Sequence, residues 1–158
     1  MPGNTTIMKN LKEQVAKLLD EQDFHYKANE EKNRFAFGIS TGNVDMDVNL
    51  LYDEEDLCLY NFCSLTSTLS EDGVVAAIYK INEIHNQSFS LAHLYIDEND
   101  NTLSAQAVME VPKNGLEKDV LETFLYSTIQ LLDDNAKDII AIASRHNNTI
   151  NNDETKIE

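Results

Sequence analysis

The stretch from Phe35 to Leu50 constrains the fold more than any other part of the sequence. Apolar residues occupy every second position on both sides of a short turn: Phe35, Phe37 and Ile39 before it, and Val44, Met46, Val48 and Leu50 after it. The turn, Thr41-Gly42-Asn43, is typical of a hairpin connection. Alternation with a period of two puts the apolar side chains of a strand on one face. The sequence therefore predicts a β-hairpin whose buried face needs a second layer to cover it.

Three further strands are predicted in the middle of the chain. The run from Leu57 to Ser64 is apolar almost throughout, so both faces of this strand should be partly covered. Two more strands are expected near residues 91–97 and 102–111, joined by the polar turn 98–101. Because the first three strands are connected by only a few residues, they should run antiparallel. The prediction is one antiparallel sheet of five strands.

Three helices are predicted around these strands. The first, near residues 6–22, follows from apolar residues at helical spacing: Ile7, Leu11, Val15 and Leu18. The second begins at Ser70-Glu71-Asp72 and has an expected apolar face of Val74, Val75, Ile78, Ile81 and His85. The third runs from near Leu116 to Ser144, and Asp133-Asp134-Asn135 leaves a break in it open. The predicted order is α-β-β-β-α-β-β-α, an α+β fold with the first and third helices on one face of the sheet.

Length and composition favour a single domain. With 158 residues, of which 42% are hydrophobic, the chain can close around one core. Residues 6–144 contain no internal repeat and no long linker, so this range is predicted to be one domain. Residues 145–158 are polar and rich in asparagine, and we expect them to form a disordered tail.

The charge of the chain argues against several classes of partner. Twenty-eight acidic residues against twelve basic ones give a net charge of −16, and Lys80 is the one base between Phe35 and Pro112. Such a field repels phosphate backbones and anionic lipid surfaces, so neither nucleic acid nor membrane is an expected partner. The acidity also has a simpler interpretation, as a source of solubility alone. Because residues 1–10 do not resemble a secretory signal, we expect a cytoplasmic protein.

The two cysteines, Cys58 and Cys63, are predicted to stay reduced. They stand five residues apart in one strand, which points their side chains to opposite faces and prevents a mutual disulfide. We expect both to be buried and chemically inert.

No metal or cofactor site is predicted, although one segment partly matches a calcium loop. Asp97, Asn99 and Asn101 have the spacing of its first three ligands, but Thr102 replaces the required glycine and Val108 replaces the closing carboxylate. A hairpin turn is the better interpretation. The acidic run Asp53–Asp56 should be a solvated loop, because consecutive side chains diverge. The four histidines, His25, His85, His93 and His146, do not have the spacing of a zinc site.

No catalytic residue is predicted either. The sequence contains no nucleophile elbow, Walker loop or dinucleotide-binding glycine motif. Asp45 and Asp47 should lie on one strand face, yet nothing indicates a cleft that would separate their pKa values. Because many acid–base sites have no motif, an enzyme of unrecognised class stays open as an alternative.

The order of helices and strands, together with particular segments, resembles the YbjN-domain family of bacterial proteins, which are described as candidate regulators of sensory transduction. The resembling segments are Phe35–Ser40, Val44–Val48, Ile81–Ile84, Leu94–Asp97, Leu121–Leu125 and Leu131–Asp133. The resemblance covers roughly Lys9 to Ser144. Ser88 and Asn101-Thr102 depart from the pattern, because the family commonly has a glycine at both places. This family is in turn similar in fold to the small acidic chaperones of type III secretion, which dimerise and hold a partner protein as an extended chain.

The resemblance implies a non-enzymatic protein-binding regulator or chaperone-like module with an unidentified protein partner. The alternatives to this function are an enzyme of unrecognised class and a structural or stress-related domain without a ligand. A homodimer is expected from excess apolar surface. One source is the outward face of the strand 57–65. The other is the last helix, because the sheet should cover only one stripe of its apolar residues. The apolar residues expected outside that stripe are Leu116, Val120, Phe124, Leu131 and Ile142.

Overall fold

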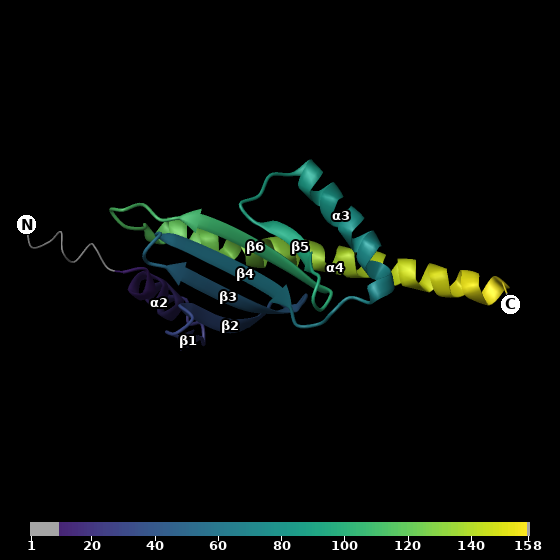
Figure 1. Cartoon of the computed structure of the whole chain (residues 1–158), viewed down its shortest axis with the longest axis horizontal. Helices are drawn as coiled ribbons and strands as arrows, with labels where there is room; N and C mark the ends of the chain where they lie inside the picture. The colour runs from purple at the N-terminus through teal and green to yellow at the C-terminus, as the bar shows by residue number, and fades with distance from the viewer. Residues whose placement is uncertain (1–9, 158) are drawn as a thin grey trace, which may run out of the picture.

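A computed structural model of the chain describes residues 10–157, with side chains from Asn10 to Arg145. Within residues 10–157, three helices and six strands follow one another (Figure 1). The helices are α2 (Leu11–Glu21), α3 (Val74–Gln87) and α4 (Lys118–Ile157), with the short 3-10 turn η1 (Glu71–Gly73) before α3. The strands are β1 (Lys27–Asn29), β2 (Arg34–Ser40), β3 (Asp45–Asp53), β4 (Cys58–Leu65), β5 (His93–Asp97) and β6 (Thr102–Glu110).

The strands form one antiparallel sheet, as predicted, but it has six strands and not five. Their spatial order is β1-β2-β3-β4-β6-β5. The additional strand, β1, pairs with the start of β2, where Ala28 lies opposite Phe35. The sequence did not indicate it because β1 has three residues and no apolar alternation. The order also differs from the order along the chain, because β6 and not β5 pairs with β4.

The hairpin predicted from residues 35–50 is confirmed, although β3 begins at Asp45 and Val44 lies in the turn. Phe37 lies opposite Val48, and Phe35 lies opposite Leu50, so the apolar residues of the two strands share a face. Gly42 in the connecting turn has φ +87°, a conformation that a side chain makes unfavourable.

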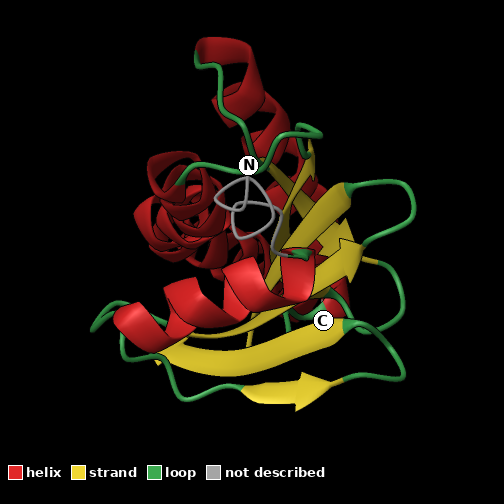
Figure 2. Cartoon of the chain, turned by 90° about the vertical axis from the view of Figure 1, so that its left-hand side faces the viewer, coloured by secondary structure: helices red, strands yellow, loops and turns green. Residues whose placement is uncertain are grey.

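Helices α2 and α4 cover one face of the sheet, as predicted (Figure 2). The core lies between these helices and the inward side chains of the strands, and its largest fully buried members include Phe35, Phe124, Leu19, Met46 and Leu59. Helix α3 flanks the edge strand β5 and packs on α4. No helix in residues 10–157 is long and apolar enough to cross a bilayer.

Helix α2 begins at Leu11 because Asn10 caps it. The side-chain oxygen of Asn10 accepts the backbone N–H of Glu13 at 2.8 Å, which satisfies a group that the helix itself leaves free. The predicted start near residue 6, including Ile7, lies outside the described residues.

Helix α4 differs from the prediction in two ways. It runs without a break past Asp133, whose carboxylate accepts hydrogen bonds from Thr41 Oγ1 at 2.5 Å and from Asn43 Nδ2 at 3.2 Å. Asp133, one of the residues that suggested a break, therefore anchors the β2–β3 turn to the helix. The helix also continues to Ile157, through the segment predicted to be a disordered tail.

Helix α3 packs through only part of the face that its sequence indicated. Ile81 is buried as predicted, and so is Ala77, whereas Val75 and Ile78 are exposed. The helix approaches α4 closely at Gly73, where an added Cβ would lie 2.7 Å from the carbonyl oxygen of Ala143. Glycine at position 73 allows this contact.

Candidate functional site

The face of the sheet opposite α2 and α4 carries no helix from residues 10–157, and we call it the open face (Figure 2). Cross-strand pairing arranges its side chains in rows that run across the strands. One row holds Leu51 of β3, Tyr60 of β4 and Val108 of β6, and the next holds Ala36 and Phe62 together with polar neighbours. Val108 is 52% exposed, and the others are half-buried. We call these five residues the apolar band.

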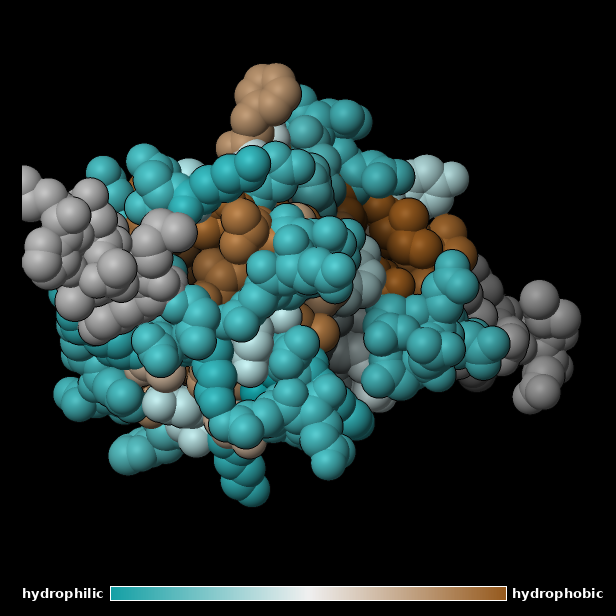
Figure 3. Space-filling model, turned by 60° about the vertical axis from the view of Figure 1, so that its left-hand side comes forward, coloured by the Kyte–Doolittle hydropathy of each residue, from teal (hydrophilic) through white to brown (hydrophobic). Residues whose placement is uncertain are grey.

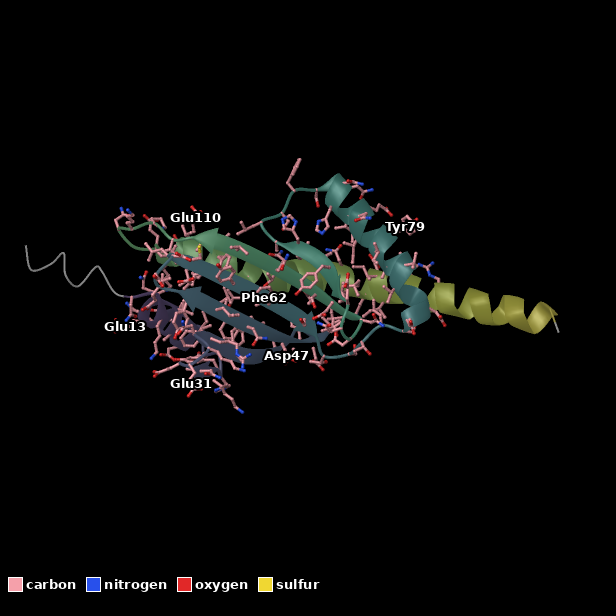
Figure 4. The ribbon with its side chains drawn as sticks, in the orientation of Figure 1. Glu13, Glu31, Asp47, Phe62, Tyr79 and Glu110 are labelled. Atoms are coloured by element: carbon pink, nitrogen blue, oxygen red, sulfur yellow. The ribbon has the colours of Figure 1, made fainter. Side chains whose placement is uncertain are left out.

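Acidic residues stand on both sides of the apolar band. On one side, Asp53 and Glu110 are aligned across Cys58. On the other side, Asp47 lies opposite Ser64, and Asp45 and Asp97 lie one row further on. In Figure 4, Phe62 lies in the middle of the sheet, between Glu110 and Asp47. None of these carboxylates forms an ion pair with a base in residues 10–145.

A second apolar surface lies where α3 crosses α4. Tyr79 is 73% exposed and Val75 is 59% exposed, and with Ala76 and Ile142 they line a shallow hollow of about 370 Å³. We call these residues the α3 surface. In the space-filling view, hydrophobic residues gather in patches between the hydrophilic ones (Figure 3). The sequence predicted excess apolar residues on the last helix, but Phe124 is buried in the core, so that prediction is wrong for this residue.

Another hollow, of about 700 Å³, lies between α2 and the start of α4. Leu18, Val120 and Leu121 supply its apolar part. Two of its charged residues form an ion pair, because Lys118 Nζ lies 3.1 Å from the carboxylate of Glu21. An exposed ion pair of this kind is a weak contact. The arrangement does not direct a set of polar groups at one point, as a site for chemistry would.

The segment that resembled a calcium loop is the hairpin turn between β5 and β6, as predicted. The carboxylate of Asp97 accepts the backbone N–H of Asn99 at 3.0 Å, and its carbonyl accepts the N–H of Asn101 at 2.8 Å. In the acidic loop, Asp53 likewise accepts the N–H groups of Glu55 and Asp56, both at 3.0 Å. Both carboxylates therefore shape their own turns.

Two of the four histidines meet, which the sequence did not indicate. The rings of His85 and His93 lie 5.6 Å apart between centroids, and His85 Nε2 accepts the backbone N–H of Leu94 at 2.9 Å. This bond ties α3 to the outer edge of β5. Within the residues whose side chains are described, no group of three or more potential ligands is placed to hold a metal ion. His25 is exposed and distant in sequence from this pair, and the side chain of His146 lies outside the described residues.

The cysteines point to opposite faces of β4, as predicted. Cys63 is buried among the core residues, and burial raises the pKa of its thiol to about 12. Cys58 lies on the open face and is half-buried, so the prediction that both are buried is wrong for this residue.

Asn61 is a residue whose role the sequence did not reveal. Asn61 stands at a position of β4 whose side chain points inward, where an apolar residue is expected, and it is fully buried. Its Nδ2 donates to the carbonyl oxygens of Phe124 at 3.0 Å and Leu125 at 3.1 Å, so it joins the sheet to α4. A polar residue at an inward position was the available signal, because buried amides need partners.

Comparison with known proteins gives matches in structure alone: no family model matches the sequence, and no curated protein matches it. The crystal structure of YbjN from E. coli, a proposed transcription regulator, superposes with a TM-score of 0.58 at 12% sequence identity, covering 86% of this chain and 92% of YbjN. The chain has a YbjN-like fold. The resemblance predicted from the sequence is therefore confirmed at the level of the fold.

Two structures of protein complexes also match. The ExsC–ExsE complex superposes with a TM-score of 0.56 at 14% identity, covering 82% of this chain and 96% of the matched chain. The HopA1–SchA chaperone–effector complex gives 0.48 at 13% identity, with 77% and 88% covered. The fold of this chain is thus also similar to that of a chain in the ExsC–ExsE complex.

Proposed function

We propose that this chain is a non-enzymatic protein-binding module, with a regulatory or chaperone-like role, that holds its partner on the open face. The observation that carries this proposal is the apolar band, an apolar surface on a sheet face that α2, α3 and α4 leave uncovered. Apolar area of this kind, with a polar border, is typical of a protein interaction surface. The cytoplasmic location expected from the sequence is part of the proposal.

Two features support binding over catalysis. The carboxylates of Asp53 and Asp97, which lie in the two acidic segments considered as metal sites, accept hydrogen bonds from their own turns. The similar folds of YbjN and of the ExsC–ExsE complex are those of a proposed regulator and of a protein that binds another protein. Fold alone does not fix function, so the proposal depends on the surface itself.

Affinity capture from the native host tests the proposal. The tagged wild-type chain should retain a protein that the Phe62→Asp variant loses, because a carboxylate in the apolar band opposes apolar contact. Glu31→Gln is a suitable control, because Glu31 is exposed in the β1–β2 turn and lies away from Phe62 (Figure 4). Equal capture by both variants would show that the partner binds elsewhere, and turnover of a small molecule by the purified chain would favour an enzyme.

We also propose that the α3 surface joins two copies of the chain. Val75, Ile78 and Tyr79 project from a helix whose other side is packed on α4, and Ile142 of α4 extends the patch. A two-fold dimer would bury this patch twice. It would leave the open face of each copy free for a partner.

A further inference from the structure

We propose that the partner segment is an amphipathic helix with basic residues on both sides of its apolar stripe, lying across the strands of the open face. This inference rests on the protein-binding function proposed above and specifies the chemistry of the occupant. It follows from three properties of the open face: the direction of the apolar band, the distance between the acidic rows, and the sign of their charge.

The apolar band runs across the strands and not along them. Leu51, Tyr60 and Val108 are direct cross-strand neighbours on three adjacent strands. Ala36 and Phe62 extend the band in the next row, and Ala36 adds β2 to it. Four strands at about 4.8 Å each make a surface roughly 19 Å wide, which a helix of about 13 residues spans at 1.5 Å per residue.

The distance between the acidic rows fits the width of a helix. Asp53 and Asp47 lie six residues apart on β3, so the rows on the two sides of the band are about 20 Å apart. An α-helix with its side chains is about 10–12 Å across, and lysine or arginine side chains reaching outward fill the remaining space on each side.

The charge of the face selects a basic occupant. Asp53 and Glu110 border one side of the apolar band, and Asp45, Asp47 and Asp97 border the other. The strand residues of this face carry two bases, Arg34 at the β2 end of the first row and Lys27, opposite Ala36 on the edge strand β1. A second copy of the chain would bring the same acidic rows and a net charge of −16, so self-association through this face is opposed.

Defined peptides can test the proposal on the full chain. The first probe is a fluorescent peptide of about 13 residues with leucines at helical spacing and lysines on both flanks. The second has glutamate in place of each lysine, and the third has a central proline that prevents the helix. We expect the basic helical peptide to bind at least about tenfold more tightly than either of the others, and its affinity to fall as salt rises.

Variants of the chain show whether binding occurs on the open face. Val108→Lys should weaken binding of the basic peptide, because it adds a positive charge to an exposed position of the band that is easily accommodated in the fold. Phe62→Asp should abolish binding, with circular dichroism confirming that the variant is folded. Asp47→Asn/Glu110→Gln should weaken binding and reduce its salt dependence.

The matched control is Glu13→Gln/Glu31→Gln, which removes the same charge from exposed positions away from Phe62 (Figure 4). Equal weakening by the two double variants would mean that the peptide senses only the net charge, and would overturn the proposal. Equal affinity for the acidic or the proline peptide would overturn it too. If Phe62→Asp still abolishes capture of the native partner in that case, the protein-binding function stands and only the chemistry inferred for the occupant is wrong.

Discussion

The side chains of Phe37 and Phe124 show how much of the stability depends on single residues. Phe124 is fully buried on α4, and Phe37 is buried on β2, where its ring stacks on Phe24 with centroids 4.7 Å apart. Phe37→Ala or Phe124→Ala should each lower the free energy of unfolding by about 3–5 kcal/mol, because each leaves a cavity. Urea denaturation measures the change, and Asp45→Ala, at an exposed position, should leave the midpoint almost unchanged. A midpoint for Phe37→Ala equal to that of the wild type would show that this face is not the core.

Cys58 and Cys63 should differ sharply in reactivity. Burial raises the pKa of Cys63 to about 12, so almost none of its thiol is ionised at neutral pH and a reagent cannot reach it. Cys58 is half-exposed on the open face. We expect iodoacetamide to modify Cys58 in the native protein and Cys63 only after unfolding, as measured by mass spectrometry of the two peptides. Modification of Cys63 first would contradict the assignment of the two faces of β4.

At the scale of helices and strands, the contact between Gly73 and α4 is the least tolerant of change. A Cβ at position 73 would lie 2.7 Å from Ala143 O and 2.8 Å from Ala143 Cβ, so α3 would have to move. Gly73→Ala should therefore lower the free energy of unfolding by about 1–3 kcal/mol. Gly38→Ala is the matched control, because its nearest atoms lie 3.9 Å away. Equal melting temperatures for the two variants would show that α3 is not packed on α4 at this point.

The sequence predicts an element well when its own periodicity is strong. The hairpin 35–50 alternates over both strands, and the two strands form and pair as predicted. Strand β1 has no such pattern and depends on pairing with β2, and the position of β6 next to β4 depends on contacts between residues far apart in the chain. The same limit applies to the candidate site. The outward residues of each strand are predictable, but the apolar band exists only once four strands are aligned.

At the scale of the whole molecule, charge repulsion opposes dimer formation and burial of apolar surface favours it. Each copy carries −16, so a dimer through the α3 surface should form more readily as salt screens the repulsion. Sedimentation equilibrium should show a dimer fraction that increases with salt and that Tyr79→Glu removes. A strict monomer of 17.9 kDa at high protein concentration, in both low and high salt, would rule the dimer out.

The pairing of β4 with β6 determines which part of the molecule can unfold locally. The segment that connects these two strands, residues 66–101, contains α3 and the edge strand β5. Its two ends are joined, because the N–H of Leu69 donates to the carbonyl of Asn101 at 2.8 Å. A segment that leaves and returns at one place can detach as a unit while the remaining strands stay paired. Native-state hydrogen exchange should therefore find α3 and β5 opening together, at a lower free energy than β3 and β4.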